Sequence, residues 1–447
     1  MYLRVILFGF YVSSFFFSMA ILAQNQPPDD RPQSSAPVSQ PAMPQLTLAS
    51  AMQTAIDRSP VLMSARYRLD AADARSAARR DGTPNPELTV EAEDFLGGDP
   101  AHGVDALQVT TSLSQELELG KKASRRRQIR RTTRDVSAVS LELTRQNLLA
   151  DVAMAFLDVL TQQERVKHAG EMVELAQITV NTVTAQVDAG RSTGMEQEKA
   201  LVELHLAELQ KKAALRDLDA TKIRLAAVCG RSQPFFEEVS GDLNVTADLP
   251  ALDDLLQRAQ QHPELKLNLA QVRQQQAIAD AEKANRLPNV KFDIGFRWNN
   301  VSSNYAMVAG VGVPIPLFDR NRGNINGAAR DVARANSDAE MGIIDKNAAI
   351  ATAYQTLRFE LDRLKTLQQD ISPRVMATFE AVAEGYRIGR FGYLDLLDAQ
   401  RTMFEIQHML LDALVKYQAA RITLSYTAGI PVSDKLFTAS NEMKQGD

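Results

Sequence analysis

Two carboxylates lie three residues apart in the segment GRFGYLDLLDAQ, directly after a pair of glycines. Asp395 and Asp398 stand at positions i and i+3, so a helix would place both on one face. Crowded carboxylates repel one another and attract cations, which suits a site that selects charge or biases an entrance open or shut. A solvated helix face is the alternative. Acid–base catalysis is not indicated, because no apolar pocket or substrate-binding signature accompanies the pair.

A dense run of cations is the second chemical feature, and it comprises Lys121, Lys122, Arg125, Arg126, Arg127, Arg130, Arg131 and Arg134. The run opens a long helical segment directly after a predicted strand. Two interpretations stay open, namely contact with anionic lipid headgroups and a solvated or salt-bridged helix face. A nucleic-acid partner is not expected, since the segment belongs to a chain with an export signal and a formal net charge of -5.

Metal, redox and nucleophilic chemistry find little support in the remaining residues. The five histidines, at 102, 168, 205, 262 and 408, show no metal-ligand spacing. Cys229 is the single cysteine, which excludes an intrachain disulfide. No phosphate-binding glycine loop, nucleophile elbow or zinc-protease motif occurs in the sequence. We therefore expect neither a metal site nor a cofactor, and no enzyme activity.

The N-terminus predicts export. Residues 1–23 combine one arginine, a long apolar run and small residues suited to cleavage after Ala20 or Ala23. An uncleaved inner-membrane anchor is the alternative, because the apolar run is longer than a usual signal core. Residues 24–45 are rich in Pro, Ser and Gln, which predicts a disordered leader. No cysteine stands directly after the signal, so no N-terminal lipid anchor is expected. No apolar segment of about 20 residues follows either, so any part that crosses a membrane must consist of strands.

The elements that position these residues occur twice. Ser59-Pro60 corresponds to His262-Pro263, and Ala189-Gly190-Arg191 corresponds to Ile388-Gly389-Arg390, in the same order and at similar spacing. The predicted repeats are 46–229 and 251–430, joined by a linker at 230–250 and followed by a C-terminal tail at 431–447. Each repeat has a short helix, a β-hairpin, a long helix and a returning helix. The hairpins are predicted at 86–118 and 288–316, the long helices at 120–189 and 320–388, and the returning helices at 193–229 and 393–429.

The long helices should pack side by side, because valines recur at every seventh position from Val152 to Val187. At 1.5 Å per residue each would extend over roughly 100 Å. Glycine at 190 and 389 tolerates the positive φ of a helix C-terminus, so each long helix is expected to reverse there.

Four strands with one apolar and one polar face are predicted, and each has about the length that crosses a bilayer when tilted. Four strands cannot close a barrel, and open edges are not tolerated in lipid, so a membrane role requires several copies of the chain. Trp298, Tyr305 and Phe95 are placed to form an interfacial aromatic girdle. A soluble sheet with one wet face is the alternative.

The repeated order of elements resembles the TolC-like outer-membrane efflux proteins over residues 46–430. The resemblance is strongest in three sequence segments, namely LTLASAMQTA at 46–55, PIPLFDRNRGNI at 314–325 and GRFGYLDLLDAQR at 389–401. The last two are similar to the CzcC-type branch, which serves cation-exporting pumps.

The resemblance implies a mostly α-helical trimer whose shared twelve-stranded barrel lies in the outer membrane above a periplasmic helical tunnel. It implies a passive exit duct for a periplasmic adaptor and an inner-membrane RND-type pump, with heavy-metal cations as the expected cargo. Asp395 and Asp398 match the acidic rings at the tunnel entrance. The implied adaptor contacts are Gly190, Arg191, Ser192, Gly389, Arg390 and Phe391. Drug efflux or type I secretion is the alternative within this fold, and a non-conducting coiled-coil scaffold or adhesin is the alternative from another class.

Overall fold

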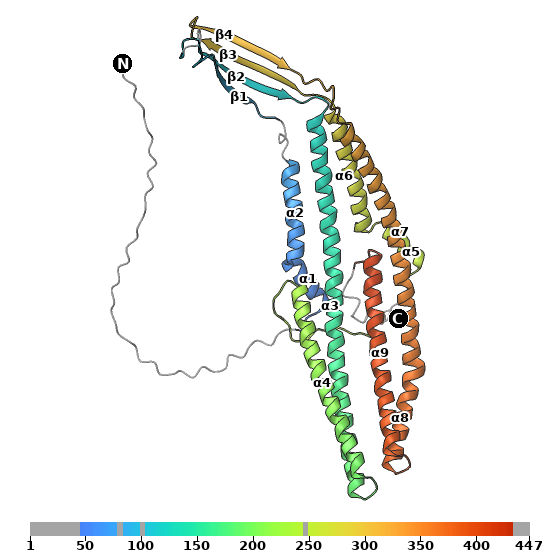
Figure 1. Ribbon diagram of the computed structural model, residues 1–447. Helices are drawn as coiled ribbons and strands as arrows, with labels where there is room; N and C mark the ends of the chain where they lie inside the picture. The colour runs from blue at the N-terminus through green and yellow to red at the C-terminus, as the bar shows by residue number, and fades with distance from the viewer. Residues whose placement is uncertain (1–44, 78–83, 99–102, 245–248, 432–447) are drawn as a thin grey trace, which may run out of the picture. The chain divides into compact units, whose positions relative to one another are not determined.

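The computed structural model describes residues 45–77, 84–98, 103–244 and 249–431, whose elements belong to one compact unit within residues 43–447 (Figure 1). The predicted signal peptide, the leader up to residue 44, the tail from residue 432 and His102 lie outside the described residues.

Helices make up most of the described chain. In the first half they are α1 (Leu48–Arg58), α2 (Pro60–Ala77), α3 (Lys122–Asp188) and α4 (Gly194–Val228). In the second half they are α5 (Leu252–Ala259), α6 (Pro263–Asn285), α7 (Arg322–Thr366), α8 (Ser372–Arg387) and α9 (Tyr393–Thr427). None of these helices is long and apolar enough to pass through a bilayer.

The second long helix departs from the sequence prediction. The pattern predicts one helix over 320–388, whereas a π-helical turn (η1, Leu367–Ile371) separates α7 from α8. Pro373 lies in the first turn of α8. Proline has no N–H to donate to the preceding turn, and its ring crowds the carbonyl there. A wider π-turn accommodates both effects, so the prediction of an unbroken α-helix is wrong at this point.

The strands form one antiparallel sheet in the order β1-β2-β3-β4, which confirms the four strands predicted from the sequence. They are β1 (Glu87–Glu93), β2 (Gln108–Leu117), β3 (Val290–Asn299) and β4 (Asn304–Gly312). The first hairpin comes from the first repeat and the second from the other, so β2 and β3 join the halves of the chain. Strands β1 and β4 each pair along one edge only.

The register sorts the strand side chains by polarity. Leu88, Leu113, Ile294 and Ala309 stand opposite one another in one row across the sheet. The row on the same face two positions further contains Val90, Thr111, Phe296 and Met307. This face is exposed, with Leu88 at 68% and Phe296 at 62%. The other face carries polar pairs, namely Thr110 with Arg297, Ser114 with Asp293 and Glu87 with Lys291.

The helices pack around α3, which contacts α1, α2, α4, α6 and α9. Valines of the seven-residue repeat lie in these contacts, and Val152 and Val159 are completely buried. A main apolar core surrounds Phe156 and Leu225, where α1, α3 and α4 meet. The heptad pattern thus corresponds to the side-by-side packing of α3 and α4.

His262 caps the start of α6 and is completely buried. Its Nδ1 accepts the N–H of Glu264 at 3.2 Å, and its Nε2 lies 3.2 Å from the carbonyl oxygen of Tyr426 on α9. Both bonds form only when the ring is neutral with its proton on Nε2. Burial is the main cause that lowers the pKa of His262, and the charge of Lys346 on α7 adds to it, with a smaller effect of Lys266. Glu264 and the Tyr426 carbonyl act in the opposite direction.

We expect the chain to lose stability as the pH falls below about 6.5, the ordinary pKa of histidine. The folded-state pKa is lowered, so the unfolded chain binds more protons in the window between the two values. The contribution of His262 is therefore complete above that window and is lost as the pH falls through it. Melting temperatures from far-ultraviolet circular dichroism across this range will measure the slope.

Two substitutions make this pH test specific. His262→Asn retains an acceptor near the position of Nδ1, so the acid-dependent slope should flatten although the lost ring packing lowers the melting temperature. His205→Asn is the control, because the His205 side chain is 71% exposed. An equal change of slope in both variants would contradict the assignment to His262.

Candidate functional site: the hairpin tips and the sheet

The first tip is a tight turn between α3 and α4. Gly190 donates its N–H to the carbonyl oxygen of Val187 at 2.9 Å, and Arg191 donates to Gln186 at 2.8 Å. This pair of bonds is the Schellman motif, which requires a positive φ at the residue after the helix cap. Gly190 has φ +70°. Arg191 is exposed, and the Ser192 hydroxyl bonds the carboxylate of Glu196 in the first turn of α4.

The second tip repeats this construction between α8 and α9. Gly389 donates to the carbonyl oxygen of Tyr386 at 3.0 Å, and Arg390 donates to Gly385 at 2.7 Å. Gly389 has φ +78°. Within the part of the chain that the structure describes, no atom lies within 4 Å of the position that a Cβ would take at Gly190 or Gly389, so the backbone conformation alone favours glycine there.

Phe391 lies against the backbone of the second tip. A Cβ added at Gly385 would lie within 2.6 Å of two ring carbons of Phe391. The ring is 41% exposed, so one side packs on the helix and the other faces outward. Only glycine at 385 leaves space for the ring in this position.

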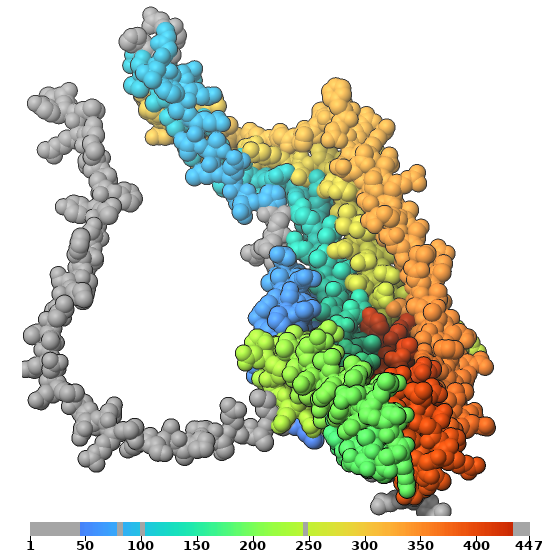
Figure 2. Space-filling view, turned by 60° about the horizontal axis from the view of Figure 1, so that its bottom comes forward, coloured from blue at the N-terminus to red at the C-terminus, as the bar shows by residue number. Residues whose placement is uncertain are grey.

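The two tips lie side by side, at the far end of the helices from the sheet (Figures 1 and 2). An apolar cluster joins them, with Val180, Val183, Ala200 and Leu204 from the first hairpin and Tyr386, Tyr393 and Leu396 from the second. Gln186 donates to the carbonyl oxygen of Arg387 at 3.3 Å. Further along, Arg401 on α9 forms an ion pair with Glu203 on α4.

The sequence analysis missed these contacts between the hairpins. Their partners are 201 and 198 residues apart in the chain. These separations are close to the spacing of the two tip glycines, so equivalent positions of the two repeats meet. A comparison of polar residues at that spacing is the signal that would have found them.

Two tyrosines place buried hydroxyls between the tips. The rings of Tyr386 and Tyr393 meet edge to face at 6.4 Å between centroids. Among the described residues, neither buried hydroxyl has a hydrogen-bond partner within normal geometry. Burial raises the pKa of both Tyr386 and Tyr393. The hydroxyl of Tyr386 faces Ser192 of the first tip, so the contact between the hairpins has a polar centre.

The predicted acidic pair begins α9, and its two members have different surroundings. Asp395 accepts the N–H of Gly392 at 2.9 Å, so it caps the helix besides carrying a charge. Asp398 is exposed and forms no ion pair with any described residue. Both side chains are exposed on the single protomer. A helix-capping role for Asp395 was not expected from the sequence.

The predicted aromatic girdle lies at the loop end of the sheet. Trp298 stands opposite Tyr305 in the β3-β4 register, on the exposed apolar face. Tyr305 is 78% exposed, and Phe95 just beyond β1 is 46% exposed. The three residues thus lie at the ends of strands furthest from the helices.

A resident metal site receives no support from the described part of the chain, in which no group of three His, Cys, Asp or Glu side chains has a metal-binding arrangement. Of the described histidines, His168 and His408 lie close enough that the charge of His168 adds to burial in lowering the pKa of His408. His168 and His205 form i,i+3 contacts with glutamates on their own helices.

A sheet with an exposed apolar face, joined to two long helical hairpins whose tips lie together, defines the TolC-like class of outer-membrane channels. The chain belongs to the outer membrane efflux protein family, whose model matches residues 51–231 and 255–429. The resemblance noted in the sequence is confirmed, and so is the outer-membrane location, with the helices in the periplasm.

Within this family, the chain is similar to several metal-resistance proteins. The chain is 30% identical to the cobalt-zinc-cadmium resistance protein CzcC of Cupriavidus metallidurans, over 84% of this chain and 88% of that protein. It is 26% identical to the nickel-cobalt-cadmium resistance protein NccC of Alcaligenes xylosoxydans xylosoxydans, over 68% of each chain. Among solved structures, CusC matches with a TM-score of 0.74 at 18% identity, over 90% of this chain and 98% of that one. The structural match supports the fold.

Proposed function

We propose that the chain forms the outer-membrane exit duct of a heavy-metal efflux system. Three copies form the duct, a periplasmic adaptor and an RND-type pump join its lower end, and metal cations pass through it passively. The observation that carries the proposal is the sheet, which has an exposed apolar face and two open edges, β1 and β4.

Open strand edges are incompatible with a lipid environment, because their N–H and C=O groups would lack partners. If β1 of one protomer pairs with β4 of the next, three protomers close a barrel of twelve strands. The apolar rows then face lipid. The polar row with Thr110 and Arg297 faces a wet interior.

The polar face of the sheet favours a conducting duct over a scaffold or adhesin. A barrel without a channel function has no need for charged side chains on its inner face, and here Lys291, Asp293 and Arg297 all lie there. Discrete conductance steps from the purified protein in planar bilayers support the duct. Their absence would favour the scaffold.

The tips are proposed as the end of the duct that meets the adaptor. Gly190, Arg191, Ser192, Gly389, Arg390 and Phe391 form this surface. In a trimer, Asp395 and Asp398 would contribute six carboxylates around the entrance, where they favour cations. The two repeats are part of this proposal. Gly190 and Gly389 are separated by the same number of residues as Gly230 and Gly429, and all four have positive φ at helix ends.

Heavy-metal cargo is proposed because the relatives named above are metal-resistance proteins and because the predicted acidic ring favours cations. A strain lacking the chain should become sensitive to zinc, cobalt, cadmium, nickel, copper or silver in graded growth assays, and the metals affected identify the cargo. Dyes, detergents and antibiotics form the parallel panel. The same strain carrying the intact chain on a plasmid is the control.

Two outcomes of the growth assay would contradict the proposal that the cargo is a heavy-metal cation. Sensitivity to the organic panel alone would retain the duct and assign it to drug efflux. Unchanged growth on both panels, together with a secretion defect, would assign it to type I secretion.

A further inference from the structure

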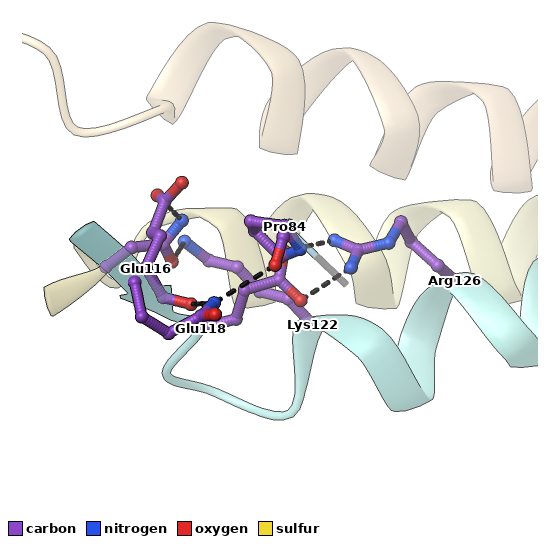
Figure 3. A network of polar contacts seen from close by, with 7 residues as sticks. Pro84, Glu116, Glu118, Lys122 and Arg126 are labelled. Carbon is purple, nitrogen blue, oxygen red and sulfur yellow. Dashed lines mark hydrogen bonds and ion pairs between the residues drawn. The ribbon is translucent and has the colours of Figure 1, made fainter. Parts of the chain in front are cut away.

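Apart from Arg130, which also has a partner, the cations of the basic run at the start of α3 form two groups. The cations of the first group form hydrogen bonds or ion pairs with other residues of the chain, and Figure 3 shows two of them, Lys122 and Arg126. Arg126 forms two bonds to Glu118, and Lys122 donates to Asn289, which in turn donates to Glu116. These contacts fix the start of α3 to the ends of the strands.

Two further arginines of the first group hold neighbouring helices. Arg125 pairs with Asp280 of α6 at 3.0 Å, and Arg134 pairs with Asp73 of α2 at 2.7 Å. Part of the basic run therefore forms a salt-bridged helix face, which is one of the two interpretations given in the sequence analysis.

The second group has no such partner. Within the described residues, Lys121, Arg127 and Arg131 form no ion pair or side-chain hydrogen bond. Residues two apart on a helix differ by about 200°. Arg125 faces α6, and so does Thr133, which accepts a bond from Gln274. Arg127 and Arg131 each lie two positions from one of these residues, so both point away from α6.

Three further cations without ion-pair partners in the described chain lie near the start of α3, where the helices meet the sheet. Asn321, at the start of α7, bonds Glu282 near the end of α6, and Leu287 lies against Gly120 before α3. These contacts bring three more arginines close to the start of α3, namely Arg286, Arg320 and Arg322. All three are exposed and form no ion pair within the described chain. The acidic neighbour Asp319 accepts the N–H of Asn321 at 2.9 Å.

An exposed apolar segment lies between these cations and the sheet. It follows β4 and contains Ile315, Leu317 and Phe318, which are 76%, 64% and 99% exposed. In the chain it connects the end of β4 to Arg320 and Arg322. Such a sequence of apolar side chains followed by cations is the pattern of a protein surface at the boundary between acyl chains and headgroups.

We propose that this belt, which we call the junction collar, binds the phosphate groups of anionic phospholipids in the periplasmic leaflet. The collar consists of Lys121, Arg127, Arg131, Arg286, Arg320, Arg322, Ile315, Leu317 and Phe318. The proposal rests on the membrane placement of the sheet in the proposed function. The occupant follows from charge complementarity and from continuity with the lipid-facing surface, because arginine binds phosphate through paired N–H donors.

The test uses the full-length protein in detergent and native mass spectrometry. Dissociation constants are measured for phosphatidylglycerol and, with the same acyl chains, for phosphatidylcholine. The wild type should prefer phosphatidylglycerol. The variant K121Q/R127Q/R131Q should weaken phosphatidylglycerol binding by on the order of tenfold and leave phosphatidylcholine unchanged. The matched control is K199Q/K211Q/K212Q, which removes the same charge from exposed positions on α4 that form no ion pair with any described residue.

Several outcomes would overturn the proposal. Equal phosphatidylglycerol binding in the wild type and the collar variant would show that these cations do not contact lipid. Displacement of the lipid by millimolar inorganic phosphate would identify a site for free phosphate. Altered ion selectivity with unchanged lipid binding would place the cations in the tunnel. Planar-bilayer conductance of each variant distinguishes failure of the lipid proposal from failure of the proposed duct. If only the lipid proposal is wrong, the protein still conducts.

Discussion

Replacing Gly295 by alanine is expected to remove most of the assembled outer-membrane trimer. Gly295 lies in β3 opposite Ser112, and a Cβ there would lie 2.4 Å from the carbonyl oxygen of Thr111 and 2.8 Å from the Cα of Ser112. Both are backbone atoms of β2, so no side-chain rotation relieves the collision. Displacement of β2 from β3 would separate the two halves of the sheet. We estimate a cost of about 3 kcal/mol per protomer, which is on the order of a hundredfold in the folding equilibrium.

Semi-native gel electrophoresis of outer-membrane fractions will measure the assembled trimer. Gly310→Ala is the matched control, because Gly310 lies on the same face of the sheet and its added Cβ would make only ordinary contacts, at 3.6 Å from the Asp293 carboxylate. Gly295→Ala should lose most of the trimer and Gly310→Ala should retain it. A normal yield of trimer for both variants would mean that β2 and β3 are arranged differently.

Removing the charges of Asp395 and Asp398 should reduce the cation preference of the channel. Six carboxylates in a trimer would raise the local cation concentration, so Asp395→Asn/Asp398→Asn should lower the ratio of cation to anion permeability by about tenfold. Asparagine retains an oxygen that can accept the Gly392 N–H, so the cap of α9 is preserved. Reversal potentials in planar bilayers under a salt gradient provide the measurement.

The controls for this pair separate charge from helix capping. Asp395→Ala removes both functions and should also lower stability by about 1 kcal/mol, whereas Asp398→Asn removes charge alone. Asp345→Asn on α7 is the matched control, because Asp345 is an exposed aspartate that forms no ion pair in the described chain. Unchanged selectivity in the double variant would exclude an acidic ring at the entrance. An equal effect of Asp345→Asn would indicate a general charge effect.

Local patterns determined much of the fold. Alternation of apolar and polar residues predicts strands because the side-chain period of a strand is two, and Phe292, Ile294 and Phe296 lie on the exposed apolar face. The valines at seven-residue spacing predict helix packing because seven residues are about two helical turns, so the valines lie along one side of the helix. Glycine at 190 and 389 predicts reversal of the chain because the required φ is strained for other residues. Each of these signals acts through residues close together in the chain.

Tertiary structure decided which of these surfaces meet. The sequence shows the basic run, but it does not show that Arg125 and Arg134 neutralise carboxylates on two other helices while Arg127 and Arg131 point elsewhere. That division depends on the rotation of α3 relative to α2 and α6, which long-range packing sets. Likewise, Arg401 meets Glu203 only because the two hairpins align.

The candidate site shows the same division. The sequence alone determined the carboxylates after the second tip, the two turns and the repeated order of elements, because each depends on local spacing. Only the folded chain decided that Asp395 also caps α9, that Tyr386 faces the first tip and that β1 and β4 are the edge strands of the sheet. These features follow from contacts between residues far apart in the chain, and no local period encodes such contacts.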